Sequence, residues 1–161
     1  MMRNNIGFTL IELLVIIAII AVLSSIGAPA FLQWRGDAKL RDAVSSLRGD
    51  LEMAKLRAMR DNEFVAVLFN TNNYLVFIDD GAGAGGVAEN WNRDGDERIL
   101  RNRQMPAGVR IDLGNTTFSD DRTRFNGRGR IGNQGVVIIV NKAGDQRTID
   151  INNRFGRITV N

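Results

Sequence analysis

Residues 8–23 read FTLIELLVIIAIIAVL, and this stretch decides the architecture of the chain. An uninterrupted apolar run begins at Leu13, and over residues 13–32 only two serines, one glycine and one proline break the apolar character. About 20 mostly apolar residues, rising about 1.5 Å each in a helix, span the roughly 30 Å hydrocarbon core of a bilayer. The composition therefore predicts a membrane-spanning helix over residues 8–32.

One carboxylate, Glu12, lies at the start of this apolar run. A lone acid in that position is costly because hydrocarbon does not solvate its charge, so the acid needs a partner. If the chain is cut after Gly7, the new amino terminus at Phe8 is a positive charge one helical turn from Glu12. The sequence thus offers the Phe8 amino group as the partner of this carboxylate.

The residues around the apolar run predict its orientation and a bend. Arg3 precedes the run and residues 1–7 contain no acid, which places the leader on the cytoplasmic side and the C-terminal part of the chain outside. Pro29 lacks a backbone donor, so we expect a kink in the helix at this residue.

The segment GFTLIE at residues 7–12, behind a short basic leader, resembles the processing site of type IV pilins and type II secretion pseudopilins. The resemblance implies cleavage by a prepilin peptidase between Gly7 and Phe8, N-methylation of Phe8, and a leader peptide over residues 1–7. An ordinary secretory signal is the alternative, because residues 24–28 loosely match a small-residue cleavage site. That alternative leaves the Gly–Phe junction and Glu12 unexplained.

The length and composition limit what the rest of the chain can form and which functions it can have. With 161 residues, about 100 remain for one globular domain after the helix. The chain has no cysteine and no histidine, which excludes disulfides, thiol nucleophiles and the commonest general base and zinc ligand. We therefore predict that the protein is not an enzyme and has no catalytic residue, metal site or cofactor.

The apolar character changes to an amphipathic pattern after the membrane span. Between residues 37 and 60, apolar residues recur at spacings of three and four, which predicts one stripe along a helix. We expect a helix over residues 8–61, membrane-spanning over 8–32 and amphipathic over 33–61, with its stripe against a β-sheet. The residues of the stripe are Leu40, Val44, Leu47, Leu51, Ala54 and Ala58.

Residues 62–161 predict a mostly antiparallel β domain, with no helix after residue 61. Short runs of strand-forming residues alternate with turn residues, and the first two runs, 64–69 and 74–78, predict a hairpin. The Gly-rich acidic segment 79–97 predicts a loop with Trp91 against the body of the domain. Further strands are expected at residues 99–105, 109–113, 123–131, 136–140, 147–151 and 156–160.

This α+β layout, a long helix followed by an antiparallel sheet, is pilin-like and resembles the GspH/FimT branch of minor pseudopilins. The resemblance implies a structural subunit of a type II secretion pseudopilus that takes part in protein export across the outer membrane. Its implied partners are prepilin peptidase and other pseudopilins or pilins. Its implied location is the bacterial inner membrane, single-pass with a periplasmic globular domain, and then the filament.

A FimT-like minor pilin that binds DNA during uptake is the alternative function. Residues 101–161 carry eleven Lys or Arg against five Asp or Glu, and arginine binds phosphates well. An opposing interpretation pairs these arginines with Asp120, Asp121 and Asp150. The candidate DNA-binding residues are Arg128, Arg130, Arg154 and Arg157.

The acidic loop also resembles a calcium-binding loop in part of its sequence. Asp94 and Asp96 alternate as oxygen ligands of Ca²⁺ do, but the loop lacks a bidentate glutamate at the twelfth position. Arg93 lies among these acids as well. The pattern therefore favours a polar turn over a calcium site, and the sequence leaves the choice open.

Overall fold

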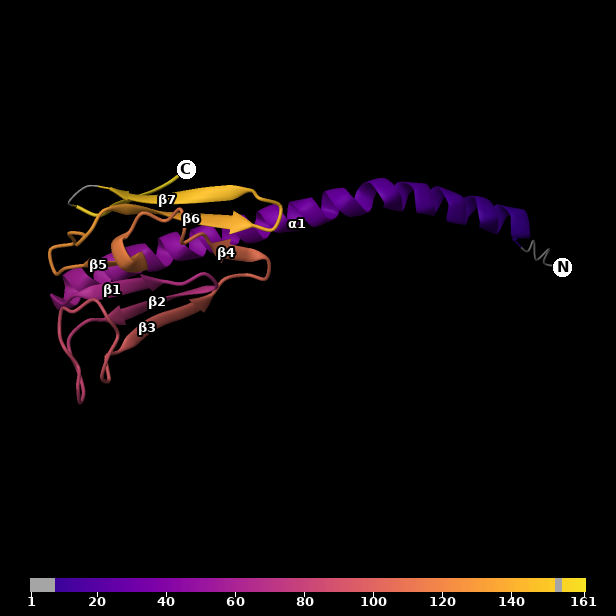
Figure 1. Ribbon diagram of the computed structural model, residues 1–161. Helices are drawn as coiled ribbons and strands as arrows, with labels where there is room; N and C mark the ends of the chain where they lie inside the picture. Colours follow the sequence, from indigo (N-terminus) through magenta and orange to yellow (C-terminus); the bar gives the residue numbers. More distant parts are fainter. Residues whose placement is uncertain (1–7, 153–154) are drawn as a thin grey trace, which may run out of the picture. The chain divides into compact units, whose positions relative to one another are not determined.

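The computed structural model describes residues 8–152 and 155–161, so Gly7 and the predicted leader lie outside the described residues. Helix α1 spans Leu10–Asp61 and precedes a β domain (Figure 1). The chain divides into two compact units, residues 1–35 and residues 36–161. The fold class predicted from the sequence, a long helix followed by antiparallel β structure, is confirmed.

The part of α1 in the first unit has no protein around it. Every described residue from Phe8 to Arg35 is exposed, although most of these side chains are apolar. The helix is long and apolar enough to cross a membrane. Ser25 donates its hydroxyl to the backbone oxygen of Val22 at 2.7 Å, so a polar group in the apolar stretch is satisfied within the helix.

The backbone of α1 is helical through Pro29, whose side chain is not among those described. A side chain added at Gly27 would meet nothing within 4 Å. The predicted kink at Pro29 stays a prediction.

In the second unit, α1 forms one wall of the hydrophobic core. All six residues of the predicted stripe are buried, and Leu47 and Leu51 are fully enclosed. Burial of such side chains is the main favourable contribution to folding, at about 25 cal/mol for each Å² removed from water. Gly49 lies on the opposite, exposed side and does not interrupt the helix. The predicted stripe and its packing against β structure are confirmed.

The β domain consists of two four-stranded sheets, not one. All strand pairs are antiparallel. The first sheet has the order β3-β2-β1-β5, with β1 Val65–Phe69, β2 Asn73–Ile78, β3 Ile99–Gln104 and β5 Arg122–Phe125. The second has the order β4-β6-β7-β8, with β4 Val109–Ile111, β6 Gly135–Asn141, β7 Gln146–Asn152 and β8 Arg157–Val160.

The register of the strands places alternate apolar residues on the face toward α1. Val65 pairs with Ile78 in the predicted hairpin of β1 and β2, which is confirmed. In the second sheet, Val137 pairs with Ile149, and both are fully buried. Because side chains alternate between the faces of a strand, this register gives each sheet one face to the core. α1 runs alongside both sheets in the globular unit (Figure 1).

The predicted strand over residues 123–131 is wrong in its second half. β5 ends at Phe125, and the chain turns over residues 126–130 before a single bridge joins Phe125 to Ile131. The Asn126 side-chain oxygen accepts the backbone N–H groups of Arg128 and Arg130, each at 3.0 Å. Such an asparagine-centred turn competes with strand pairing, and the glycines of this segment permit it.

The prediction of no helix after residue 61 also needs a correction. One turn of 3-10 helix, η1, spans Ser119–Asp121. Asp120 and Asp121 both have positive φ, which aspartate tolerates better than most residues. The turn brings Phe118 into the core, where its ring lies 5.5 Å from that of Phe69.

Candidate assembly and nucleic-acid surfaces

Hydrogen bonds between Thr9 and Glu12 cap the N-terminal end of α1. The backbone N–H of Glu12 donates to the Thr9 hydroxyl at 3.3 Å, and the Thr9 N–H donates to a Glu12 carboxylate oxygen at 3.5 Å. Reciprocal bonds of this kind form a capping box, which satisfies donors that a helix end leaves free. Glu12 therefore caps the helix in this structure.

Sequence reasoning assigned Glu12 only a charge partner and missed the cap. The signal was present, because Thr9 and Glu12 have the spacing of a capping box immediately before an apolar run. Phe8 and Glu12 are both exposed, and Gly7 lies outside the described residues.

The predicted DNA-binding arginines lie on two turns that the fold brings together. Gly129 of the first turn and Gly156 of the second are in close contact, since a Cβ added at Gly156 would lie 3.2 Å from the Gly129 oxygen. Lys55 of α1 donates its amino group to the Gly156 oxygen at 3.1 Å. Arg128 and Arg130 lie in the first turn and Arg157 begins β8 directly after the second turn, while Arg154 lies outside the described residues.

These three arginines are exposed, and none forms an ion pair within the described part of the chain. The pairing considered as an alternative occurs elsewhere, since Asp120 binds Arg122 at 2.8 Å and Asp150 accepts a bond from the Asn152 amide. A hollow of about 560 Å³ lies beside Arg130 and is lined by Asn126, Arg130, Ile131, Gly132 and Gln134. The two turns therefore present free guanidinium groups to solvent.

Another arginine, Arg124, forms contacts within the globular unit. Its guanidinium lies 4.2 Å from the centre of the Phe64 ring and 4.4 Å from that of Trp91, and it donates to the backbone oxygen of Glu89. A guanidinium between two aromatic faces is held by cation–π attraction. This contact confirms that Trp91 packs against the body of the domain, and sequence reasoning gave no sign of the role of Arg124.

The carboxylates of the acidic loop bind backbone donors. Asp79 is buried and accepts the N–H groups of Asn90 and Trp91 at 3.2 and 3.1 Å. Glu97 is also buried and accepts those of Gly81 and Asp94 at 3.0 and 3.1 Å. Among the described residues, no three potential ligands converge on a metal site. The geometry supports the polar-turn interpretation of this loop.

A third buried carboxylate, Asp50, joins α1 to the first sheet. It accepts the Tyr74 hydroxyl at 2.7 Å and the Arg103 Nε at 2.8 Å, and Arg101 lies 3.5 Å away. Burial by itself would raise the pKa of Asp50, but these hydrogen bonds and the two positive charges hold that pKa below its usual value. Burial and the bond to Asp50 raise the pKa of Tyr74.

Two family descriptions match the chain, and together they cover both units. Residues 43–154 match the family described as type II transport protein GspH. Residues 2–28 match the prokaryotic N-terminal methylation motif, which includes Gly7, Phe8 and Glu12. A curated relative, the prepilin peptidase-dependent protein D of Escherichia coli, is 52% identical over 40 residues. That match spans 25% of this chain and 27% of the relative.

Solved structures with the same fold include three bacterial proteins. The type IV minor pilin FimU of Pseudomonas aeruginosa has a TM-score of 0.56 at 15% identity, covering 78% of this chain and 90% of FimU. The minor pseudopilin EpsH from the type 2 secretion system of Vibrio cholerae has a TM-score of 0.57 at 12% identity, with 76% and 95% covered. The solution structure of Escherichia coli GspH has a TM-score of 0.54 at 12% identity, with 77% and 88% covered.

Proposed function

We propose that this chain, which belongs to the type II transport protein GspH family, is a minor pseudopilin that takes part in protein export by a type II secretion system. The observation that carries the proposal is the pairing of a GspH-type globular unit with a helix whose N-terminal half is apolar and exposed. Such a helix needs lipid or neighbouring helices around it. A subunit that moves from the membrane into a filament is surrounded first by lipid and then by neighbouring helices.

The proposed mechanism is assembly, and it uses the start of α1. A prepilin peptidase cuts between Gly7 and Phe8, and the new amino group is methylated. Glu12 then neutralises this group in its own subunit or in the neighbouring one, so that neither charge is buried alone. The methylation motif found over residues 2–28 supports this sequence of events.

The remaining assignments follow from the same role. The protein acts as a structural subunit and not as an enzyme, and its partners are prepilin peptidase and other pseudopilins. Before assembly it crosses the inner membrane once with residues 8–32 and holds its globular unit in the periplasm. The positive charge of Arg3 and the absence of acids in residues 1–7 support this orientation.

The experiment that tests the class of the protein is an intact-mass measurement from cells with and without prepilin peptidase. We expect a mass that lacks Met1–Gly7 and carries one added methyl group, only when the peptidase is present. An unprocessed chain, or a cut near Ala28, would contradict the proposal, because an ordinary anchor or secretory signal would then explain the apolar helix.

A second candidate function, DNA capture by a FimT-like minor pilin, is favoured by one observation. The contact between Gly129 and Gly156 joins the segments that carry Arg128, Arg130 and Arg157, and none of these arginines forms an ion pair in the described residues. Exposed guanidinium groups without acidic partners suit contacts with backbone phosphates, whose strength falls steeply with salt.

This candidate is tested by a mobility shift of duplex DNA with the mature chain in nanodiscs of neutral lipid. We expect binding at low salt, and a salt dependence reduced by about one ion in the Arg128→Ser variant. Arg110→Ser is the matched control, because Arg110 is an exposed arginine on β4, away from these turns. Absence of a shift at low salt, or equal losses in both variants, would exclude the basic turns as a DNA site.

A further inference from the structure

A hollow of about 270 Å³ lies between α1 and the second sheet and is ringed by arginines. We call it the arginine pocket. Arg41, Ser45 and Arg48 come from successive turns of α1, so they share one face of the helix. The lining residues are Arg41, Val44, Ser45, Arg48, Arg147 and Val160. The lining of the pocket thus combines two apolar side chains with three arginines and a serine.

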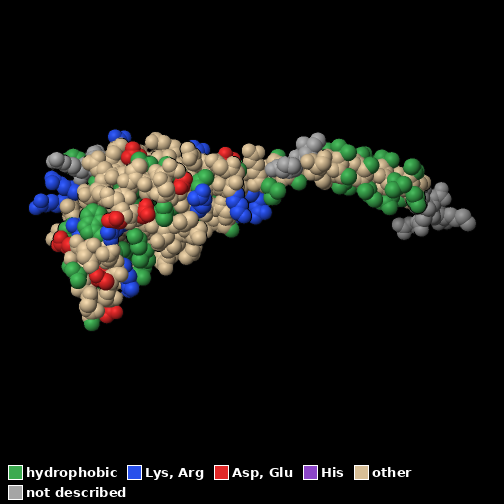
Figure 2. Space-filling view, viewed as in Figure 1, with side chains coloured by type: hydrophobic (Ala, Val, Ile, Leu, Met, Phe, Trp, Pro, Cys, Tyr) green, Lys and Arg blue, Asp and Glu red, His purple; other side chains and the backbone are tan. Residues whose placement is uncertain are grey.

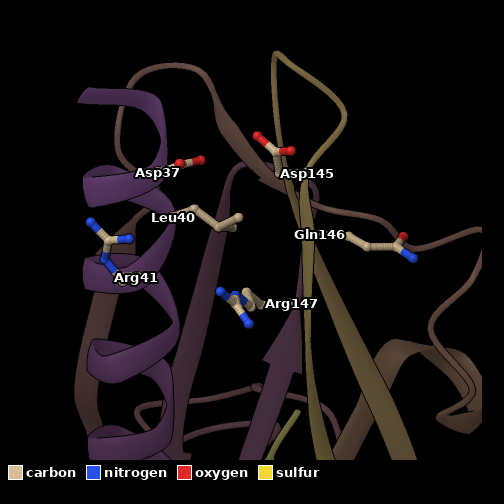
Figure 3. A pocket seen from close by; sticks show the side chains of 6 residues that line it. All are labelled: Asp37, Leu40, Arg41, Asp145, Gln146 and Arg147. Carbon is tan, nitrogen blue, oxygen red and sulfur yellow. The ribbon is translucent and has the colours of Figure 1, made fainter. Parts of the chain in front are cut away.

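The three arginines of this pocket are free to bind a partner. All are exposed, and within residues 8–152 and 155–161 none forms an ion pair. The neighbouring hollow, of about 290 Å³, shares Arg41 and Arg147 and has Asp37 and Asp145 at its far side (Figure 3). The residues that line the arginine pocket itself therefore include three arginines and no acid.

The same chain also has an acidic surface, opposite in charge to the arginine pocket. The loop over residues 79–97 protrudes from the first sheet, and acidic and apolar side chains gather at its end (Figures 1 and 2). Val87 is 57% exposed in this loop. Asp80, Glu89 and Asp96 are exposed around it, whereas Asp79 and Glu97 are buried against backbone donors. The loop thus offers an apolar residue with three available carboxylates.

We propose that the acidic loop of one copy of this chain docks into the arginine pocket of a second copy. Val87 meets Val44 and Val160 of the pocket lining, while the exposed carboxylates face the three arginines. The two surfaces differ, so the contact is heterologous and joins unlike faces of the two copies. The proposal concerns the globular units and goes beyond the proposed function, because it requires neither processing nor a secretion machine.

The charges in this contact are exposed, so the contact is weak for free molecules and is screened over about 8 Å at physiological salt. Anchoring of the copies in one membrane or filament raises their effective concentration and favours the contact. Complementary charge also fixes which surfaces meet, since like charges repel.

The absence of cysteine from the sequence permits a direct test by disulfide formation. Two full-length single-cysteine variants, Ser45→Cys and Val87→Cys, are purified with tags of different size, mixed in the same nanodiscs or vesicles, and oxidised. We expect the mixed disulfide to form at least several-fold more than either homodimer, because only the mixed pair aligns loop and pocket. A mixed disulfide no more than about twice as abundant as either homodimer, which is the ratio that random pairing gives, would overturn the proposal.

Charge reversal then tests the proposed chemistry in the same assay. Arg48→Glu in the Ser45→Cys chain should lower the mixed disulfide several-fold, and Glu89→Arg in the Val87→Cys chain should restore it. Arg110→Glu is the matched control and should leave the yield unchanged, because Arg110 lies on β4 outside the pocket. No loss with Arg48→Glu, or an equal loss with Arg110→Glu, would overturn the pairing.

Two outcomes separate this proposal from its alternatives. If the Ser45→Cys chain forms disulfides with another filament subunit and never with Val87→Cys, the occupant is not a second copy and the proposal fails. If the mass measurement shows no processing while the mixed disulfide forms, the proposed function fails and the contact stands. Thermal melts of each variant confirm that loss of the disulfide does not reflect unfolding.

Discussion

At the scale of single residues, the buried carboxylate of Asp50 shows how polar groups are tolerated in the core. Its partners are Tyr74 on β2 and Arg103 on β3, so one side chain of α1 joins two strands of the first sheet. A buried carboxylate is stable only when such hydrogen bonds replace water. The network therefore fixes the helix on the sheet and makes stability depend on pH.

We predict that stability falls on acidification through Asp50. Its folded pKa lies below the usual value of 3.8, so its contribution is complete above that pH and is lost as the pH falls through the folded pKa. Asp50→Asn should lower the free energy of unfolding by about 1–3 kcal/mol at pH 7 and flatten its decline below about pH 4. Urea unfolding from pH 7 to pH 2.5 measures both effects.

The control for this prediction is Asp120→Asn. Asp120 is 73% exposed and binds only Arg122 at the surface, so we expect a change of at most about 1 kcal/mol. A pH profile that is the same in Asp50→Asn and in the unmodified chain would show that other carboxylates determine the acid sensitivity.

Glu12 combines a helix cap with a proposed charge partner, and two substitutions separate these roles. Glu12→Gln keeps a side-chain acceptor for the Thr9 N–H but removes the charge, whereas Glu12→Ala removes both. We predict that both variants are processed but incorporated poorly into filaments, as measured in sheared fractions. Normal incorporation of Glu12→Gln would show that the charge is not needed.

At the scale of elements, α1 has different surroundings along its length. The described residues up to Arg35 are exposed and mostly apolar, whereas from Leu40 to Ala58 one stripe is enclosed by the two sheets. Most helical stability in proteins comes from packing of such a face and not from intrinsic propensity. The second half of α1 thus contributes to the core of the globular unit, and the first half depends on lipid or other subunits.

We predict that Leu47→Ala destabilises the globular unit by about 2–5 kcal/mol, because it opens a cavity in a fully enclosed site. Leu56→Ala is the matched control on the same helix. Leu56 is 62% exposed, so its truncation should cost less than about 1 kcal/mol. Thermal or urea unfolding of the two variants makes the comparison. Similar losses in both would mean that α1 does not pack as described.

At the scale of the whole molecule, the arginines of the described residues include some that are paired with acids and others that are free in solvent. Arg101, Arg103, Arg122 and Arg124 bind acids, while the arginines of the pocket and of the two basic turns face solvent. Paired arginines hold parts of the globular unit together. Free arginines are the ones available to partners, and they determine where the molecule attracts anionic surfaces.

We predict that Arg124 attaches the acidic loop, residues 79–97, to the rest of the globular unit. Arg124→Ala removes the group between Phe64 and Trp91, at a cost of about 0.5–2 kcal/mol, and frees the loop. We expect limited proteolysis within residues 79–97 to be several-fold faster in this variant. Arg110→Ala is the control, with an unchanged rate. An unchanged rate in Arg124→Ala would show that Asp79 and Glu97 hold the loop without this contact.

The sequence by itself determined the features that depend on local periodicity. An apolar run predicts a membrane span, and a spacing of three and four predicts the stripe from Leu40 to Ala58, because helical geometry repeats over a few residues. Short alternating runs predicted most strands, and the hairpin of β1 and β2 followed from one turn. The GFTLIE segment likewise predicted the class of protein from six adjacent residues.

Only the tertiary structure decided which surfaces these residues form. The division into two sheets, the contact between Gly129 and Gly156, and the ring of Arg41, Arg48 and Arg147 all join residues far apart in the chain. Whether an arginine is paired or free depends on which acid the fold brings within about 4 Å of it, and composition carries no such distances. The partners of each charge are therefore a property of the packed chain and not of its local pattern.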